Sequence, residues 1–218
     1  INWLRVMGQL SYYVWLTTKF SSPINVAIPS GNFGNAYSAW FGRQHGLSIK
    51  NILCSTNVND VLRRFIESGT LKPKETYPSI APSMDIQIPS SLERLIFDLS
   101  GSAEHFYNTF STTGEATLQD DALNTLKMIF SSETFNDEDI KHKIGELYKE
   151  FDYVFDPHTA TSVAMALNNG DNIPTVAVAT ASPEKFGTVI NEVIDAYSIV
   201  SLDEKEELIQ LAVDKDII

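Results

Sequence analysis

The chain has 218 residues, 43% hydrophobic and 20% charged, which are values of a folded globular protein with room for one large α/β domain. Its formal net charge of −12 argues against nucleic acid or an anionic membrane as partner, because both bind basic surfaces, and it has no apolar run long enough to span a membrane. The one cysteine, Cys54, cannot form an internal disulfide, which fits a reducing compartment such as the cytoplasm.

The first pattern along the chain is helical and covers about residues 2–19. Apolar residues occur on most of its faces, so we expect this helix to be buried on both sides. The chain starts at Ile1 and opens directly into this pattern, so we also expect an upstream part to be missing. Residues 25–29 and 49–55 read as short strands on either side of a helix over 36–45, an order that predicts a parallel pair.

A turn with two glycines joins the first strand to its helix. Gly31 and Gly34 can take positive φ without steric cost, so we expect them to direct main-chain N–H groups toward one point. The first N–H groups of the following helix have no intrahelical partner and carry partial positive charge. The stretch therefore predicts a phosphate cradle, although the same pattern also makes an ordinary strand-to-helix connection that binds nothing.

The middle of the chain has a long connection, 70–89, of a length that tends to be functional or mobile. Ser90 and Glu93 then form a capping-box pattern at the start of a helix. Residues 102–150 carry helical patterns, which we interpret as a helical insertion. This interpretation divides the α/β part of the chain into residues 1–101 and 151–218.

The last third returns to alternating helix and strand. Residues 158–167 form a helix of small side chains, and 175–180 a strand of the kind buried in parallel sheets. A final pair of helices follows, the second with a capping box of Ser201 and Glu204. The fold class predicted from this order is α/β, a parallel sheet flanked by helices.

Polar residues follow each of the three predicted strands, in segments 30–35, 55–59 and 180–182. Ligands of open parallel sheets bind at the carboxyl ends of the strands, so we expect these segments to converge. Asn59 or Asp60 can cap the helix that follows 55–59. For Asn59 we favour this capping role, and for Arg63 a solvated or ion-paired position, over a place in the site. Histidines and cysteines do not occur at ligand spacing, so no metal site is predicted.

Six stretches of the sequence, in order, resemble threonine synthases, which are pyridoxal-phosphate enzymes of the fold shared with the tryptophan synthase β subunit, fold type II. The stretches are 1–5 (INWLR), 30–35 (SGNFGN), 55–65, 82–86 (PSMDI), 151–164 and 179–186. The resemblance implies an incomplete fold of that type with pyridoxal 5'-phosphate as cofactor. It also implies a cytoplasmic lyase of threonine biosynthesis that converts O-phospho-L-homoserine and water to L-threonine and phosphate.

The resemblance assigns roles to particular residues. The cofactor's phosphate is expected at Gly31, Asn32, Phe33, Gly34 and Asn35, and a neutral hydroxyl beside its pyridine nitrogen at Thr180. Arg5 is expected to bind the substrate's phosphate, and His158 is expected near the substrate. From the residues alone, a strand position is the favoured explanation of Thr180, and a helix-capping turn explains His158 at least as well as a place in the site.

The Schiff-base lysine of the family lies upstream of the cradle. Lys19 is the only lysine before Asn25 in this sequence, and it lacks the neighbouring residues that accompany the Schiff-base lysine in the family. We therefore expect a C-terminal portion with no catalytic residue of its own, which depends on the upstream part of the same protein and is inactive alone. A homodimer is left open. Two alternatives are a threonine-synthase-like phospho-lyase that releases phosphate without making threonine, and a non-catalytic phosphate-ligand-binding domain that has lost its lysine.

Overall fold

The computed structural model describes residues 2–196. Its centre is a four-stranded sheet with strand order β5-β2-β1-β6, in which all neighbours are parallel. The predicted α/β fold with a parallel sheet is confirmed. A separate antiparallel pair joins β3 to β4. The strands are β1 (Ile24–Pro29), β2 (Ile49–Thr56), β3 (Thr70–Leu71), β4 (Ala116–Thr117), β5 (Phe130–Thr134) and β6 (Thr175–Ala177).

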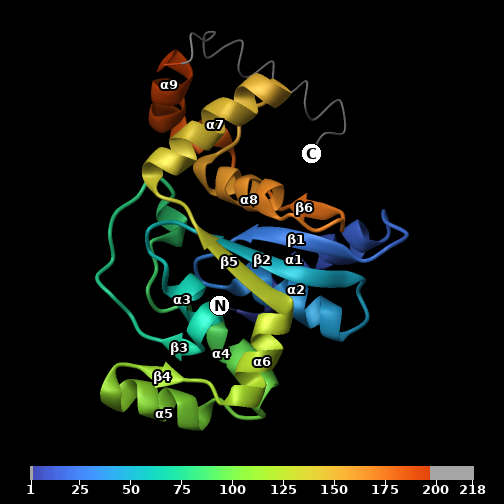
Figure 1. Cartoon of the computed structure of the whole chain (residues 1–218), viewed down its shortest axis with the longest axis vertical. Coiled ribbons are helices and arrows are strands. Elements are labelled where there is room, and N and C mark those ends of the chain that lie inside the picture. Colours follow the sequence, from blue (N-terminus) through green and yellow to red (C-terminus); the bar gives the residue numbers. More distant parts are fainter. Residues whose placement is uncertain (1, 197–218) are drawn as a thin grey trace.

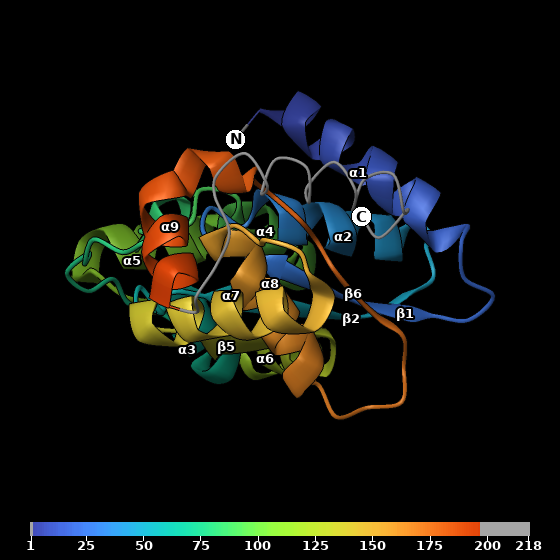
Figure 2. The same cartoon turned by 90° about the horizontal axis from the view of Figure 1, so that it is seen from above.

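Helices cover both faces of the sheet. Figure 1 shows α7, α8 and α9 on one side and α3, α4 and α6 on the other, with α5 beside the β3–β4 pair. Figure 2 shows α1 on the outer side of α2. The helices are α1 (Trp3–Thr17), α2 (Gly34–Gln44), α3 (Val61–Ser68), α4 (Leu92–Ser100), α5 (Glu104–Thr113), α6 (Asp120–Ile129), α7 (Asp137–Phe151), α8 (Pro157–Asn168) and α9 (Gly187–Ala196).

Consecutive residues of the central strands alternate between two cores. Val26 and Cys54 belong to the cluster on the α2 side, whereas Ala27 and Leu53 belong to the cluster on the α8 side. Side chains of a strand point to opposite faces in turn, so a strand covered on both faces needs an unbroken apolar run. This requirement explains why β1 and β2 were recognisable in the sequence.

The expectation that α1 is buried on both sides is wrong. Val6 and Tyr13 are its buried side chains, whereas Leu4 is 76% exposed and Trp15 is 60% exposed. The inner face packs on α2, and nothing among the described residues covers the outer face. Apolar residues around a helix therefore did not guarantee burial within this chain.

We expected segment 102–150 to be a helical insertion, but it is not purely helical. It contains β4 and also β5, which forms an edge of the main sheet by pairing from Ile52 with Phe130 to Thr56 with Thr134. Helix α6 passes directly into β5 without a turn residue. The edge strand is mostly polar, so no apolar run marked it in the sequence.

The C-terminal elements agree in part with those predicted from the sequence. Strand β6 is shorter than the predicted 175–180, and α9 is the first of the two expected final helices. The second, with Ser201 and Glu204, lies outside the described residues. Within residues 2–196, no helix has the length and apolar character needed to cross a membrane.

Candidate active site

The turn between β1 and α2 has a different backbone from the expected one. Neither Gly31 nor Gly34 has positive φ; instead Phe33, the N-cap of α2, is left-handed with φ 65°. A bulky residue rarely adopts this conformation unless its surroundings hold it. The Phe33 side chain is 2% exposed, and its ring lies 5.6 Å from that of Phe130 on β5. Burial of the ring therefore stabilises the turn.

Gly31 is needed for space and not for its dihedral angles. A Cβ atom at this position would lie 2.6 Å from the carbonyl oxygen of Ser83 and 3.1 Å from Cα of Met84. These are backbone atoms of the connection that leads to α4, so the main chain of that connection passes directly against the turn. Only glycine permits this close approach without a shift of the backbone.

The N-terminus of α2 opens onto the same turn. Its first intrahelical hydrogen bond runs from the Tyr37 N–H to the Phe33 carbonyl, at 2.9 Å. The N–H groups of Gly34, Asn35 and Ala36 therefore have no partner within the helix. No acceptor for them is seen among the described residues. Together with the helix dipole, these free donors make a site suited to a phosphate group.

A pocket of about 240 Å³ lies at this turn. Every residue to which the family resemblance assigns a cofactor or substrate role lines it, although these residues come from α1, from the turn, from α8 and from the loop after β6. These residues are Arg5, Gly31, Asn32, Phe33, Gly34, Asn35, His158 and Thr180. The structure thus brings the whole expected set together at the carboxyl ends of β1 and β6.

Some lining residues escaped the sequence analysis. Gln9 also faces the pocket from α1, one turn after Arg5, and Ser83 and Met84 reach it from the connection before α4. A polar residue every three or four positions in an otherwise apolar helix was the available signal for Gln9. The resemblance of residues 82–86 to threonine synthases was the signal for the other two.

Asn35 is fixed by two tyrosines of α1. Its Oδ1 accepts a hydrogen bond from the Tyr13 hydroxyl at 2.7 Å and another from the Tyr12 hydroxyl. Burial raises the pKa of Tyr12 to about 12 and that of Tyr13 well above its ordinary value, so both hydroxyls keep their protons at neutral pH. Because its oxygen is fully used, the Asn35 side chain offers only its amide N–H donors to a ligand.

Asn32 ties the turn to the start of α4. Its Oδ1 accepts from the Ser90 hydroxyl at 3.2 Å, and its carbonyl accepts from the Ser91 N–H at 3.0 Å. The predicted capping box of Ser90 and Glu93 is wrong, since the N-cap of α4 is Ser91 and makes no side-chain capping bond. The Ser90 hydroxyl is directed to the cradle instead.

Arg5 and His158 differ in their freedom to bind a ligand. Arg5 is exposed and makes no ion pair within residues 2–196. His158 is 3% exposed; its Nδ1 lies 3.0 Å from Oδ1 of Asp156, and its Nε2 accepts from the Ser83 N–H at 3.2 Å. Asp156 caps α8, so the capping turn expected from the residues is present. Both ring nitrogens of His158 already have protein partners.

The expectation that segment 55–59 converges with the other two on the site is wrong, because this turn after β2 holds the connection before α4 and does not line the pocket. Asp85 Oδ1 accepts from Asn57 Nδ2 at 2.6 Å, from Asn59 Nδ2 at 3.0 Å and from the Ser79 hydroxyl at 2.7 Å. Of the two residues expected to cap the next helix, Asp60 is the N-cap of α3 and the favoured Asn59 is not. The two buried asparagines therefore position the residues that form one side of the pocket.

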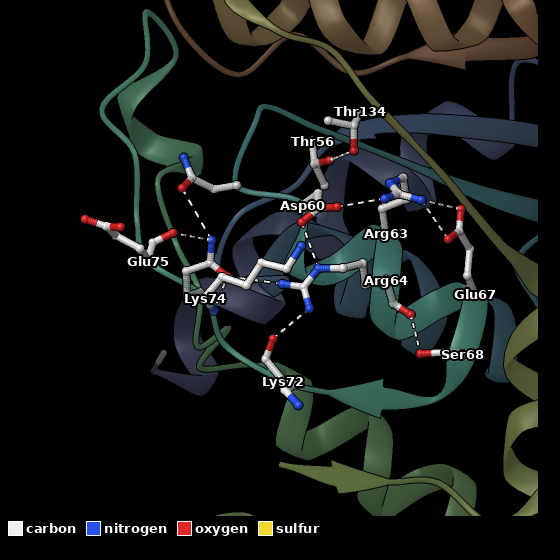
Figure 3. A network of polar contacts seen from close by, with 12 residues as sticks. Thr56, Asp60, Arg63, Arg64, Glu67, Ser68, Lys72, Lys74, Glu75 and Thr134 are labelled. Atoms are coloured by element: carbon white, nitrogen blue, oxygen red, sulfur yellow. Dashed lines mark hydrogen bonds and ion pairs between the residues drawn. The ribbon is translucent and has the colours of Figure 1, made fainter. Parts of the chain in front are cut away.

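Arg63 is ion-paired, which is one of the two positions expected for it. It binds Asp60 at 2.7 Å and Glu67 at 2.7 Å, and Arg64 binds Asp60 at 2.8 Å and the Lys72 carbonyl at 2.7 Å (Figure 3). Burial acts to raise the pKa of Asp60, but hydrogen bonds from both arginines outweigh it, and the pKa lies below its ordinary value. This network anchors the beginning of the long connection to α3.

Lys19 lies away from the pocket. Its Nζ is 4.7 Å from the centre of the Trp15 ring at the end of α1, and no lysine lines the pocket in the described part of the chain. Over the same residues, no cluster of histidine, cysteine and acidic side chains is arranged to hold a metal ion.

Comparisons with known proteins show what this fold and this sequence are similar to. The fold is that of fold-type II pyridoxal-phosphate enzymes. Yeast threonine synthase superposes with a TM-score of 0.88 and 27% identity, covering 98% of this chain and 48% of that one. The pyridoxal-phosphate-bound threonine synthase of Brucella melitensis gives a TM-score of 0.86 and 28% identity, covering 96% and 47%.

The sequence is also similar to those of threonine synthases. Threonine synthase of Pseudomonas aeruginosa is 33% identical over 202 residues, which are 88% of this chain and 43% of that protein. No protein-family model matches the chain. The resemblance to the threonine synthases is confirmed, and the chain spans a little under half the length of the relatives it matches.

Proposed function

We propose that this chain is the C-terminal portion of a threonine synthase, which uses pyridoxal 5'-phosphate to convert O-phospho-L-homoserine and water to L-threonine and phosphate. The observation that carries the proposal is the pocket at the N-terminus of α2. Eight residues that the family resemblance implies, from four separate segments, line it together. Chance packing of a strand-to-helix turn does not assemble such a set.

The residues of the pocket fit the cofactor. The free N–H groups of Gly34, Asn35 and Ala36 would hold its phosphate, with a further donor from the Asn35 side chain. Thr180 would present a hydroxyl to the pyridine nitrogen, which binds the nitrogen without enforcing its protonation. When bound, the cofactor supplies a ring that withdraws electrons from the substrate and so permits loss of its phosphate.

Arg5 is the proposed ligand of the substrate's phosphate. Its guanidinium is exposed at the pocket, and no acidic partner competes for it in the described part of the chain. A planar guanidinium binds a phosphate dianion through two parallel hydrogen bonds, which fixes the leaving group as well as neutralising it.

The rest of the site would come from the upstream part of the same protein. No lysine lines the described pocket, and its volume of about 240 Å³ is below the roughly 300–1,000 Å³ of typical small-molecule sites. The upstream part would supply the Schiff-base lysine and the remaining walls. On this proposal the 218 residues alone are inactive, and the whole enzyme works in the cytoplasm.

The test uses the full native protein, including whatever precedes Ile1. We expect a visible cofactor absorbance band, and both phosphate and threonine when O-phospho-L-homoserine is added. Arg5→Ala should raise the KM for this substrate by about ten- to a hundredfold, the value of a charged hydrogen bond. The matched control is Arg43→Ala at the far end of α2, where the side chain donates a hydrogen bond to the Lys50 carbonyl and does not line the pocket.

Each other outcome has a defined meaning. Phosphate without threonine would replace the proposal by a phospho-lyase. A protein without a cofactor band that still binds inorganic phosphate would be a non-catalytic phosphate-ligand-binding domain. An Arg5→Ala variant with unchanged KM would remove Arg5 from the substrate site.

A further inference from the structure

A buried carboxylate beneath the pocket is the centre of a branched set of hydrogen bonds. Oδ1 of Asp156 accepts from the backbone N–H groups of His158 (2.9 Å) and Thr159 (3.3 Å), and lies 3.0 Å from Nδ1 of the His158 ring. Its Oδ2 accepts from the Thr159 hydroxyl. Asp156 is 1% exposed, so these donors replace water around the charge.

Each branch ends on a different wall of the pocket. Through His158, the carboxylate reaches Ser83, whose N–H donates to Nε2 at 3.2 Å. Through Thr159, it reaches Thr180, whose N–H donates to the threonine hydroxyl oxygen at 3.2 Å. Ser83 and Thr180 both line the pocket and are far apart in the sequence.

The carboxylate also sets the direction of both branches. The His158 ring can accept from Ser83 only if its proton is on Nδ1, where it donates to Asp156. The Thr159 hydroxyl presents a lone pair to Thr180 because its own proton is directed to Asp156. If the carboxylate became an amide, neither the ring tautomer nor the hydroxyl orientation would remain specified.

We propose that Asp156 is a positioning residue that holds the Ser83 and Thr180 walls of the pocket in register with the cradle. Its effect on cofactor binding rests on the proposed function, whereas its effect on the two walls does not. His158 acts in this set as a connecting side chain and not as a substrate ligand. The Ser83 wall also adjoins Gly31, so a shift of that wall would change the cradle itself.

The test compares three variants of the full native protein by hydrogen–deuterium exchange in peptides that contain Ser83 and Thr180. Asp156→Asn should speed exchange at both amides by about tenfold, the value of one buried hydrogen bond. Thr159→Val should speed exchange at Thr180 alone. The control is Thr161→Val, which removes an equally buried hydroxyl from the same helix, bonded to Ser55 and to the His158 carbonyl. It should leave both amides within about twofold of the unaltered protein.

Titration with pyridoxal 5'-phosphate, followed by its absorbance, gives the second measurement. Affinity should fall by about tenfold in Asp156→Asn and less in Thr159→Val, with no change in Thr161→Val. Unchanged exchange at Ser83 and Thr180 in Asp156→Asn, with α8 still protected, would overturn the inference. If that variant does not fold, unchanged exchange at Thr180 in Thr159→Val would do so. A parent protein that binds no cofactor would contradict the proposed function, while the exchange pattern would still decide the role of Asp156.

Discussion

Replacing Gly31 by alanine tests the close contact between the cradle and the connection before α4. The new Cβ would lie 2.6 Å from the Ser83 carbonyl oxygen, about 1 Å closer than a comfortable contact of about 3.5 Å. The Ser83 backbone cannot simply move away, because its N–H is bonded to His158. Gly31 does not have positive φ, so the effect is steric only. Overpacking of this kind costs about 1–3 kcal/mol.

For a chain of 218 residues, that cost corresponds to a fall in Tm of roughly 2 to 12 °C. Thermal unfolding followed by circular dichroism measures it, and inorganic phosphate binding should weaken in parallel. Gly8→Ala is the control: nothing lies within 4 Å of its added Cβ inside α1, so it should raise stability by about 0.5–1 kcal/mol. A Gly31→Ala protein with unchanged Tm and phosphate binding would refute a fixed contact at the cradle.

Two further predictions concern the interior. Asp85→Ala should lower the free energy of unfolding by about 2–4 kcal/mol, because it removes a carboxylate that accepts hydrogen bonds from Asn57, Asn59 and Ser79 together. Truncating the ion-paired Arg63 should cost at most about 1 kcal/mol. Urea unfolding of both variants checks this, and equal losses would contradict it. Burial raises the pKa of the Cys54 thiol from 9.0 to about 12, so its contribution to stability should be complete below pH 9 and lost between pH 9 and 12. The free energy of unfolding should fall less steeply with pH over that window in Cys54→Ala than in the unaltered protein. Identical slopes would exclude Cys54 as a source of the pH dependence.

Much of the fold was visible in the sequence because burial on two faces imposes a strong pattern. The runs around Val26 and Leu53 marked β1 and β2 for this reason. Glycines with positive φ follow the ends of α2, α3 and α4, at Gly46, Gly69 and Gly101, as is common for helix termini. These signals are local, since each depends on a few consecutive residues and on the immediate environment of the backbone.

Features that depend on distant partners were missed. Nothing in the residues around Phe130 announces a strand, because β5 exists through its pairing with β2. The Ser90 hydroxyl appeared to be a helix cap, but Asn32 takes its hydrogen bond instead. The left-handed conformation of Phe33 depends on the packing of its ring, which no local rule anticipates. Predicting such features requires the tertiary structure.

The candidate site itself was recognised through resemblance more than through chemistry. The turn at Gly31 to Asn35 was equally compatible with an ordinary connection until six ordered stretches of family similarity were considered together. Five of the six contribute lining residues to one pocket, which lies at the edge where β1 and β6 end. Asp156 was overlooked because a helix-capping aspartate is common, and its links to Ser83 and Thr180 appear only in three dimensions.

The pairing of Phe33 with Phe130 limits how far this protein can be trimmed or recombined. A designer who removed residues 102–150 as a dispensable module would also delete β5. The deletion would expose the backbone of β2 as a new sheet edge, which invites aggregation. It would also deprive Phe33 of the aromatic ring against which it packs. Loop grafting and circular permutation should therefore keep α6 and β5 together with the cradle as one inseparable unit.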